Sequence, residues 1–112
     1  MIHGDGSQTR DFVHVRDVAD ALWRLGIESA PTGTWNVATG RRTTITELAD
    51  AVERASGRRL HRVFGPRRPG DVTSSVVSAG RLKAIGWRPE VRLSAGIAEL
   101  VREASPAGDR RP

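Results

Sequence analysis

Apolar and polar residues follow two different periods along the chain, and the first change of period comes near residue 16. The β-rich run Phe-Val-His-Val at residues 12–15 follows the tight-turn pair Asp5–Gly6, which predicts a hairpin over residues 1–15. From Asp17 onward apolar residues recur at helical spacing, with Asp17 in the N-cap position and Gly26 near the end. The start of the chain is therefore expected to form a hairpin that leads into a helix.

The middle of the chain carries the clearest local signals. Pro31 and Gly33 interrupt the pattern, and residues 34–38 (Thr-Trp-Asn-Val-Ala) are typical of a short buried strand. Residues 44–47 (Thr-Ile-Thr-Glu) form a capping box, in which Thr and Glu side chains satisfy the first free amides of a helix. Gly57 stands where a left-handed C-cap belongs, so a helix is predicted between these two signals.

The last fifty residues predict shorter elements. Extended segments are expected at 60–64 and 72–77, separated by an arginine-bearing loop at 66–70. Ser78 is placed to cap a small helix that stops at Gly86, and a final helix carries Ile97, Leu100, Val101 and Ala104. This order predicts a mixed α/β (α+β) fold, with one domain at residues 1–105 and a disordered tail at 106–112.

Composition limits the class of protein. A chain of 112 residues can bury one modest core but not two. It contains no cysteine, which excludes disulfides and thiolate metal sites and suits a reducing compartment, so a cytoplasmic location is expected. No apolar run reaches membrane-spanning length, and the first five residues lack the features of a signal peptide.

Charge suggests an anionic partner. The formal net charge is +5, and all but one of the 18 basic residues are arginine, whose planar fork matches phosphate oxygens. A GC-rich genome is an equally good explanation of this arginine content. The most basic segment, residues 57–70, holds a single aromatic residue, Phe64, and no alternation of arginines with stacking rings. Nucleic acid is therefore disfavoured as a partner.

Motifs for catalysis and metal binding are missing from the sequence. The three histidines, His3, His14 and His61, lie far apart and have no carboxylate at helical i+4 spacing, so no metal site is predicted. The chain has no tyrosine, no G-x-S-x-G elbow, no Walker loop and no G-x-G-x-x-G dinucleotide loop. We therefore predict no catalytic residue.

Anion binding is the chemistry that remains. Arg10 follows a tight turn, and Arg68 and Asp71 lie on a loop stiffened by proline. An arginine next to a carboxylate suits a nucleoside diphosphate, because the guanidinium binds phosphate and the carboxylate accepts hydrogen bonds from ribose hydroxyls. A surface salt bridge is the alternative interpretation of the same residues.

Three blocks then appear in a recognisable order: GDGSQTRDFVHVRDVADA at 4–21, TWNVATGRRTTITELADAVERASG at 34–57 and RRPGDVTSSVVSAGRLKAIGWRP at 67–89. Together they resemble the C-terminal part of extended short-chain dehydrogenase/reductases. The nearest group is the NAD-dependent nucleotide-sugar epimerases and dehydratases of carbohydrate metabolism, of the UDP-glucose 4-epimerase type. The resemblance covers residues 2–104, nearly the whole chain.

This resemblance implies a role for four residues. Arg10 and Arg68 would hold the diphosphate of a nucleotide-diphosphate sugar, Asp71 would bind the ribose, and Gln8 is a weaker candidate in the same block. In the family, an N-terminal Rossmann half carries the NAD loop and the Tyr-x-x-x-Lys pair that moves protons. The helix from Asp17 and the strand at Trp35 would pack onto that half, as elements that join its sheet.

The chain also departs from the family pattern. The NAD loop and the Tyr-x-x-x-Lys pair are absent, Ser78 stands where an aspartate is usual, and Ala38 replaces a glycine. The resemblance thus implies a substrate-binding lobe, inactive alone, that associates with a Rossmann-domain partner or forms a homodimer. The alternatives are a basic nucleic-acid-binding protein and a non-catalytic partner subunit of another epimerase. The sugar, the nucleotide and the reaction subtype are not determined by the sequence.

Overall fold

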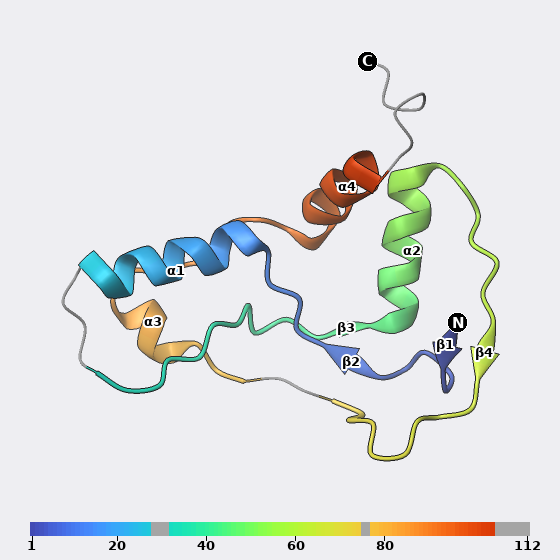
Figure 1. The fold of residues 1–112 in the computed structure, drawn as a ribbon, viewed down its shortest axis with the longest axis horizontal. Coiled ribbons are helices and arrows are strands. Elements are labelled where there is room, and N and C mark those ends of the chain that lie inside the picture. Colours follow the sequence, from blue (N-terminus) through green and yellow to red (C-terminus); the bar gives the residue numbers. More distant parts are fainter. Residues whose placement is uncertain (28–31, 75–76, 105–112) are drawn as a thin grey trace.

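The computed structural model describes residues 1–27, 32–74 and 77–104, which form a slab 47 × 42 × 17 Å in extent. Because a helix with its side chains is about 10–12 Å wide, the slab is at most two elements thick. Figure 1 shows the elements spread out in this plane, with α1 and α3 toward one end and α2 and α4 toward the other. In chain order they are β1 (Ile2–His3), β2 (Thr9–Arg10), α1 (Val15–Ile27), β3 (Thr43–Thr44), α2 (Ile45–Ser56), β4 (Phe64–Gly65), α3 (Gly80–Ala84) and α4 (Leu93–Ala104).

Helix α2 begins and ends where its sequence signals predict. The hydroxyl of Thr44, the N-cap residue, accepts a hydrogen bond from the Glu47 amide at 3.0 Å. Gly57 adopts φ 69° and donates its amide to the Glu53 carbonyl, which is the left-handed C-cap expected of glycine. The prediction of this helix is confirmed. Helix α2 packs against α4, which also forms where predicted.

Helix α1 begins at Val15, so the prediction that Asp17 is its N-cap is wrong. Asp17 lies in the first turn and is buried, and its carboxylate accepts hydrogen bonds from the amides of Glu90 and Val91 at 3.0 and 3.1 Å. The Trp87 indole donates to the Asp17 carbonyl at 2.9 Å. The Asp17 carboxylate therefore accepts hydrogen bonds from backbone amides of a distant loop and not from the first amides of its own helix. The local sequence pattern does not reveal these partners.

The predicted hairpin over residues 1–15 is also wrong. The turn at Asp5 exists, since its carboxylate accepts the Ser7 amide at 2.9 Å, but the strands beside it pair elsewhere. Strand β1 pairs in parallel with β4, and β2 pairs antiparallel with β3. Residues 12–14 form no strand and lead directly into α1. Each strand thus finds a partner contributed by a later part of the chain.

Other predicted strands are shorter than expected or unpaired. The short buried strand predicted at residues 34–38 is wrong, because this segment forms no strand and Ala38 is its one buried residue. Of the segment 60–64, Phe64 alone enters a strand. In the segment 72–77, Ser74 forms an isolated parallel bridge with Thr9, while residues 75–76 lie outside the described residues. The fold is mixed α/β, as predicted, with little sheet of its own.

The main core lies where α1, α3 and the extended segment 34–38 meet. Among the described residues, only Leu82 and Trp87 are large side chains with under 2% exposure, and they cluster with the buried residues Ala21, Ala38 and Ala79. Larger, partly buried hydrophobic residues pack against this cluster: Leu25, Trp35, Val37 and Ile85. The Ser78 hydroxyl accepts the Gly80 amide at 3.1 Å at the start of α3, although Ala79 holds the N-cap position itself. The predicted small helix is confirmed. The tail predicted at 106–112 lies outside the described residues.

Helix α1 is apolar on two faces. Ala21 and Leu25 face the core, whereas Val15, Leu22, Trp23 and Ile27 are exposed by 61–74%. These four residues recur at spacings of 7, 8 and 12 from Val15 and therefore share a stripe along the outer side of the helix. We call them the outer stripe. None of the described helices is long and apolar enough to cross a membrane.

Candidate functional site

Arg10 is held in place by two neighbouring segments. Strand β2 pairs with β3, with Arg10 opposite Thr43, so the start of α2 fixes one side of the strand. On its other side, the amide of Thr9 donates to the Thr73 carbonyl at 2.9 Å. Arg10 thus projects from a backbone fixed on both sides, although its strand is only two residues long.

Asp71 reaches Arg10 because of a tight turn. In the sequence Arg68-Pro69-Gly70-Asp71, the Asp71 amide donates to the Arg68 carbonyl at 3.1 Å, and Gly70 adopts φ 77°. Proline followed by a glycine of positive φ is typical of a type II turn. The turn brings the Asp71 carboxylate within 2.9 Å of the Arg10 Nη2 atom. Two predicted site residues that are distant in sequence are therefore in contact.

A cavity of about 270 Å³ lies beside this ion pair. It opens between the loop that follows β1 and the loop that follows β4, which the parallel pairing of β1 and β4 brings side by side. The residues that line it are His3, Gly4, Asp5, Ser7, Gln8, Arg67, Asp71 and Thr73. Gln8 is fixed in its wall, because the side-chain amide donates to the His3 carbonyl at 2.9 Å.

The structure brings together three of the four predicted site residues. Gln8 and Asp71 line the cavity, and Arg10 contacts Asp71 from behind with 29% of its side chain exposed. Arg68 is exposed and is not part of the cavity lining in the described residues. Its neighbour Arg67 lines the cavity and donates to the Thr73 hydroxyl. Which of these two adjacent arginines lines the cavity depends on the path of the loop, and the sequence does not give that path.

Asp5 places a second carboxylate at the cavity. Hydrogen bonds from the Ser7 hydroxyl and then the Ser7 amide lower the pKa of Asp5 below its ordinary value of 3.8. The positive charge of Arg67 lowers this pKa further. The cavity wall therefore combines two carboxylates with one arginine, while Arg10 stands behind Asp71. Arg67 in this wall can bind an anion, and the two carboxylates can accept hydrogen bonds from hydroxyl groups.

Asp11, next to Arg10, organises the backbone instead of lining the cavity. Its carboxylate accepts the amides of Thr39 and Gly40 at 3.0 and 2.8 Å, and also the Thr39 hydroxyl. Gly40 adopts φ 79°, a conformation that suits glycine at this turn. Two of the aspartates that follow Arg10 in the first sequence block, Asp11 and Asp17, thus brace loops far along the chain, whereas Asp20 pairs with Arg24 on its own helix.

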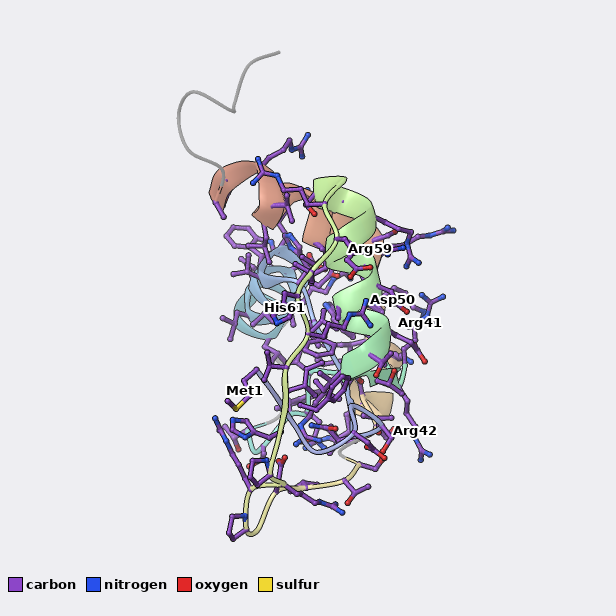
Figure 2. The ribbon with its side chains drawn as sticks, turned by 90° about the vertical axis from the view of Figure 1, so that its right-hand side faces the viewer. Met1, Arg41, Arg42, Asp50, Arg59 and His61 are labelled. Carbon is purple, nitrogen blue, oxygen red and sulfur yellow. The ribbon has the colours of Figure 1, made fainter. Side chains whose placement is uncertain are left out.

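A second depression of about 300 Å³ was not predicted from the sequence. Arg41 and Arg92 line it together with Thr39 and Glu90, and it contains none of the predicted site residues. Figure 2 shows Arg41 and Arg42 projecting from one edge of the molecule. Within the described residues, no group of three or more histidines, aspartates or glutamates is placed to hold a metal ion.

In the basic segment 57–70, part of the positive charge is neutralised by ion pairs with helix α2. Arg62 forms ion pairs with Asp50 at 2.6 Å and Glu53 at 3.1 Å, both on α2. These two partners raise the pKa of Arg62, with the hydrogen bond to Asp50 contributing most. Glu53 also accepts the Leu60 amide at 3.0 Å, so this arginine fastens the returning chain to α2.

Comparison with known proteins gives a consistent result. The sequence model of the family GDP-mannose 4,6 dehydratase matches residues 1–100. A UDP-glucose 4-epimerase of Mycolicibacterium smegmatis is 42% identical over 101 residues, which cover 89% of this chain and 32% of that protein. The chain thus spans about a third of the length of this relative.

Solved structures agree with the sequence comparison. The UDP-glucose 4-epimerase of Thermotoga maritima, crystallised with UDP-glucose, matches with a TM-score of 0.81 and 35% identity over 89% of this chain and 33% of its own. The UDP-glucose 4-epimerase of Thermus thermophilus, in complex with NAD, matches with a TM-score of 0.79 and 34% identity over 93% of this chain and 35% of its own. The chain therefore belongs to the GDP-mannose 4,6 dehydratase family of extended short-chain dehydrogenase/reductases, as its three sequence blocks suggested.

Proposed function

We propose that this chain binds the nucleotide of a nucleotide-diphosphate sugar, as the substrate-binding portion of a cytoplasmic NAD-dependent epimerase or dehydratase. The observation that carries the proposal is the contact between Arg10 and Asp71, residues 61 positions apart that meet at 2.9 Å beside a cavity. The UDP-glucose in the Thermotoga maritima relative supports this class of ligand.

Each site residue has a role in this proposal. Arg10 binds the diphosphate, and Asp71 accepts hydrogen bonds from the ribose hydroxyls. Gln8 lines the cavity beside Asp71, and its side-chain amide donates to the His3 carbonyl. Arg68 is exposed at the first position of the turn that carries Asp71, from which a flexible arginine side chain can reach the same phosphates. Arg67, already in the cavity wall, is a second candidate for that contact.

Calorimetric titration with UDP-glucose and a dTDP-sugar tests the proposal. A charge-assisted hydrogen bond contributes about 1.5–3 kcal/mol, so Arg10→Ala should weaken binding by roughly 10- to 100-fold. Arg24→Ala is the matched control, because this arginine pairs with Asp20 on α1, away from the cavity. Equal affinity in the wild type and in Arg10→Ala would show that the site is assigned to the wrong residues.

NAD does not fit the residues of this chain. The segments before the four helices contain no G-x-G-x-x-G loop to receive a dinucleotide, and the chain has no tyrosine for a Tyr-x-x-x-Lys pair. We therefore derive no hydride or proton transfer from these residues. By our proposal the chain is inactive alone, and NAD belongs to the two thirds of the relatives that this chain does not match.

The outer stripe of α1 supports a partner for this chain. A helix that is apolar on both faces is expected to be buried on both, and the slab is too thin to cover the stripe itself. The extended segment 34–38 ends beside the same core and has no strand partner among the described residues. We propose that a Rossmann domain packs on this side, and that a homodimer is the alternative arrangement.

Gel filtration with light scattering checks this second proposal. The double variant Leu22→Glu/Trp23→Glu should be monomeric, whereas the wild type should self-associate when its partner is absent. Since both side chains are about two-thirds exposed, the variant should keep the wild-type circular dichroism spectrum. A wild type that is a stable monomer at high concentration would contradict the proposal.

Nucleic-acid binding is the second candidate function. The ion pair between Arg62 and Asp50 gives it no support, because this arginine of the basic segment is already paired within the chain.

A further inference from the structure

Two depressions adjoin each other between α2 and the start of α4. The depression of about 300 Å³ described above is lined by Arg41 and Arg92, and another of about 380 Å³ is lined by the same two arginines and by Arg54. Thr43 and Leu93 also line both depressions. We call the two depressions together the arginine hollow. In the described part of the chain, it shares no lining residue with the cavity of the proposed nucleotide site.

The three arginines reach the hollow from three separate segments. Arg41 belongs to the loop before β3, Arg54 lies in the last turn of α2, and Arg92 directly precedes α4. All three residues are exposed. Within residues 1–27, 32–74 and 77–104, their guanidinium groups form no ion pair and donate no hydrogen bond. Their planar sets of N–H donors are therefore available to bind an oxyanion.

Arg54 lacks the ion pair that its place on α2 would favour. Asp50 stands four positions before Arg54, and this spacing and order favour an ion pair on a helix. The Asp50 carboxylate instead contacts the Nη2 atom of Arg62 at 2.6 Å. Arg62 therefore neutralises the carboxylate that would otherwise compensate the charge of Arg54.

Positive charge exceeds negative charge in the arginine hollow. The lining includes three carboxylates, those of Glu47, Asp50 and Glu90, and that of Asp50 is already neutralised by Arg62. Among the described residues, three arginines without a partner thus face two carboxylates without one. The like charges of the arginines repel one another, and a bound anion relieves this repulsion. A phosphate monoester carries about 1.5 to 2 negative charges at neutral pH, which is enough to compensate the excess.

The depression of about 300 Å³ also offers contacts that a bare phosphate cannot use. Its apolar wall is formed by Phe12, Pro89, Val91 and Leu93. The Glu90 carboxylate lines the same depression and can accept hydrogen bonds from hydroxyl groups. A sugar ring presents both kinds of group, because its C–H faces are apolar and its hydroxyls are donors. The hollow therefore suits a ligand with a phosphate at one end and a hydroxylated organic part at the other.

We propose that the arginine hollow is a second ligand site, which binds a hydroxylated phosphate monoester such as a sugar phosphate. Arg41, Arg54 and Arg92 bind the phosphate, while the apolar wall and Glu90 bind the organic part. This site goes beyond the proposed nucleotide site and does not depend on it, because the two linings have no described residue in common.

An NMR titration of the backbone amides with glucose 6-phosphate tests this proposal. The amides of Thr43, Leu93 and Ser94 should shift, because these residues line the hollow. The amides of Gln8 and Thr73, which line the cavity of the proposed nucleotide site, should stay in place. UDP should give the opposite pattern if the proposed function is right, so a failure of one proposal is distinguishable from a failure of the other.

Two neighbouring arginines provide a matched pair of variants. Arg41→Gln should weaken the binding of glucose 6-phosphate about 10-fold, the lower end of the range for a hydrogen bond to a charged group. Arg42→Gln loses the same charge one position further on, at a residue that projects from the same edge in Figure 2 but lines neither depression. Since salt screens exposed charges, this control should change the affinity by less than about twofold. Because both arginines are exposed, both variants should keep the wild-type spectrum outside the hollow.

Three results would overturn the proposal. The first is a wild type in which glucose 6-phosphate leaves the amides of the hollow unmoved, a measurement that no folding defect affects. The second is an equal loss of affinity in Arg41→Gln and Arg42→Gln, which would indicate general attraction between charges in place of a site. The third is inorganic phosphate that binds as tightly as glucose 6-phosphate, because the organic part would then make no contact.

Discussion

Replacing Asp17 by alanine removes the contact that joins α1 to the loop before α4. Asp17 is 4% exposed and its carboxylate accepts the amides of Glu90 and Val91, so alanine leaves both amides without an acceptor. A buried donor left unsatisfied costs about 1–3 kcal/mol. Because both amides are only partly buried, we take the lower half of that range for each and expect a loss of about 3 kcal/mol in the free energy of unfolding.

Urea denaturation followed by circular dichroism measures this loss. With a slope of about 1–2 kcal/mol/M for a chain of this size, the midpoint should fall by roughly 2 M while the slope stays constant. Asp20→Ala is the control on the next turn of α1. Its side chain is 43% exposed and pairs with Arg24 at 3.1 Å, and such pairs contribute about 0.3–0.5 kcal/mol.

Two further comparisons sharpen this experiment. Asp17→Asn keeps one acceptor oxygen, so its midpoint should lie between those of the wild type and Asp17→Ala. If Asp17→Ala loses no more stability than Asp20→Ala, then water replaces the carboxylate at the two amides, and our account of this contact is refuted.

Two other predictions concern backbone conformation and pH. Gly57→Ala should lower the free energy of unfolding by about 1 kcal/mol, because Gly57 adopts φ 69° and nothing lies within 4 Å of the added methyl group. Gly26→Ala inside α1 should instead raise the free energy of unfolding by about 0.5 kcal/mol. If the two substitutions had equal effects in thermal denaturation, the explanation from backbone conformation would be contradicted. The lowered pKa of Asp5 implies stability that is present above the unfolded value near 3.8 and is lost as pH falls through the lower folded value. The urea midpoints of Asp5→Asn and the wild type should therefore differ at about pH 7 and converge in acid, and a constant difference would contradict this.

The sequence predicted the elements whose determinants are local. The capping residues of α2 depend on contacts within four positions, so the residue types suffice to identify them. Helix α4 shows the same principle through its apolar periodicity. These local signals do not depend on contacts with distant parts of the chain.

The strand pairings could not be predicted in this way. The turn at Asp5 is compatible with a hairpin, but the later segments β3 and β4 compete successfully for the strands beside it. Asp17 was misplaced for a similar reason, since its partners lie more than seventy residues further on. Nothing in either local sequence indicates these partners.

The candidate site was predicted in part. The family resemblance selected Arg10 and Asp71, which the structure brings together, but their roles stay a prediction until binding is measured. Arg67 and His3 were missed because their place in the cavity depends on the pairing of β1 with β4. The residue types indicated the chemistry, whereas the lining of the cavity followed from contacts between distant segments.

The pairing of β1 with β4 has a consequence for the order of folding. Each of the two strands has two residues, and their pairing brings Ile2 next to Phe64. The entropy cost of closing this long loop is therefore offset by few hydrogen bonds. Helix α2 needs no such closure, because its caps lie within its own sequence. We therefore expect the amides of Ile2 and Gly4, although hydrogen-bonded, to exchange with solvent faster than those of α2. For the same reason, we expect the cavity beside the loops that follow these two strands to form last and to open first.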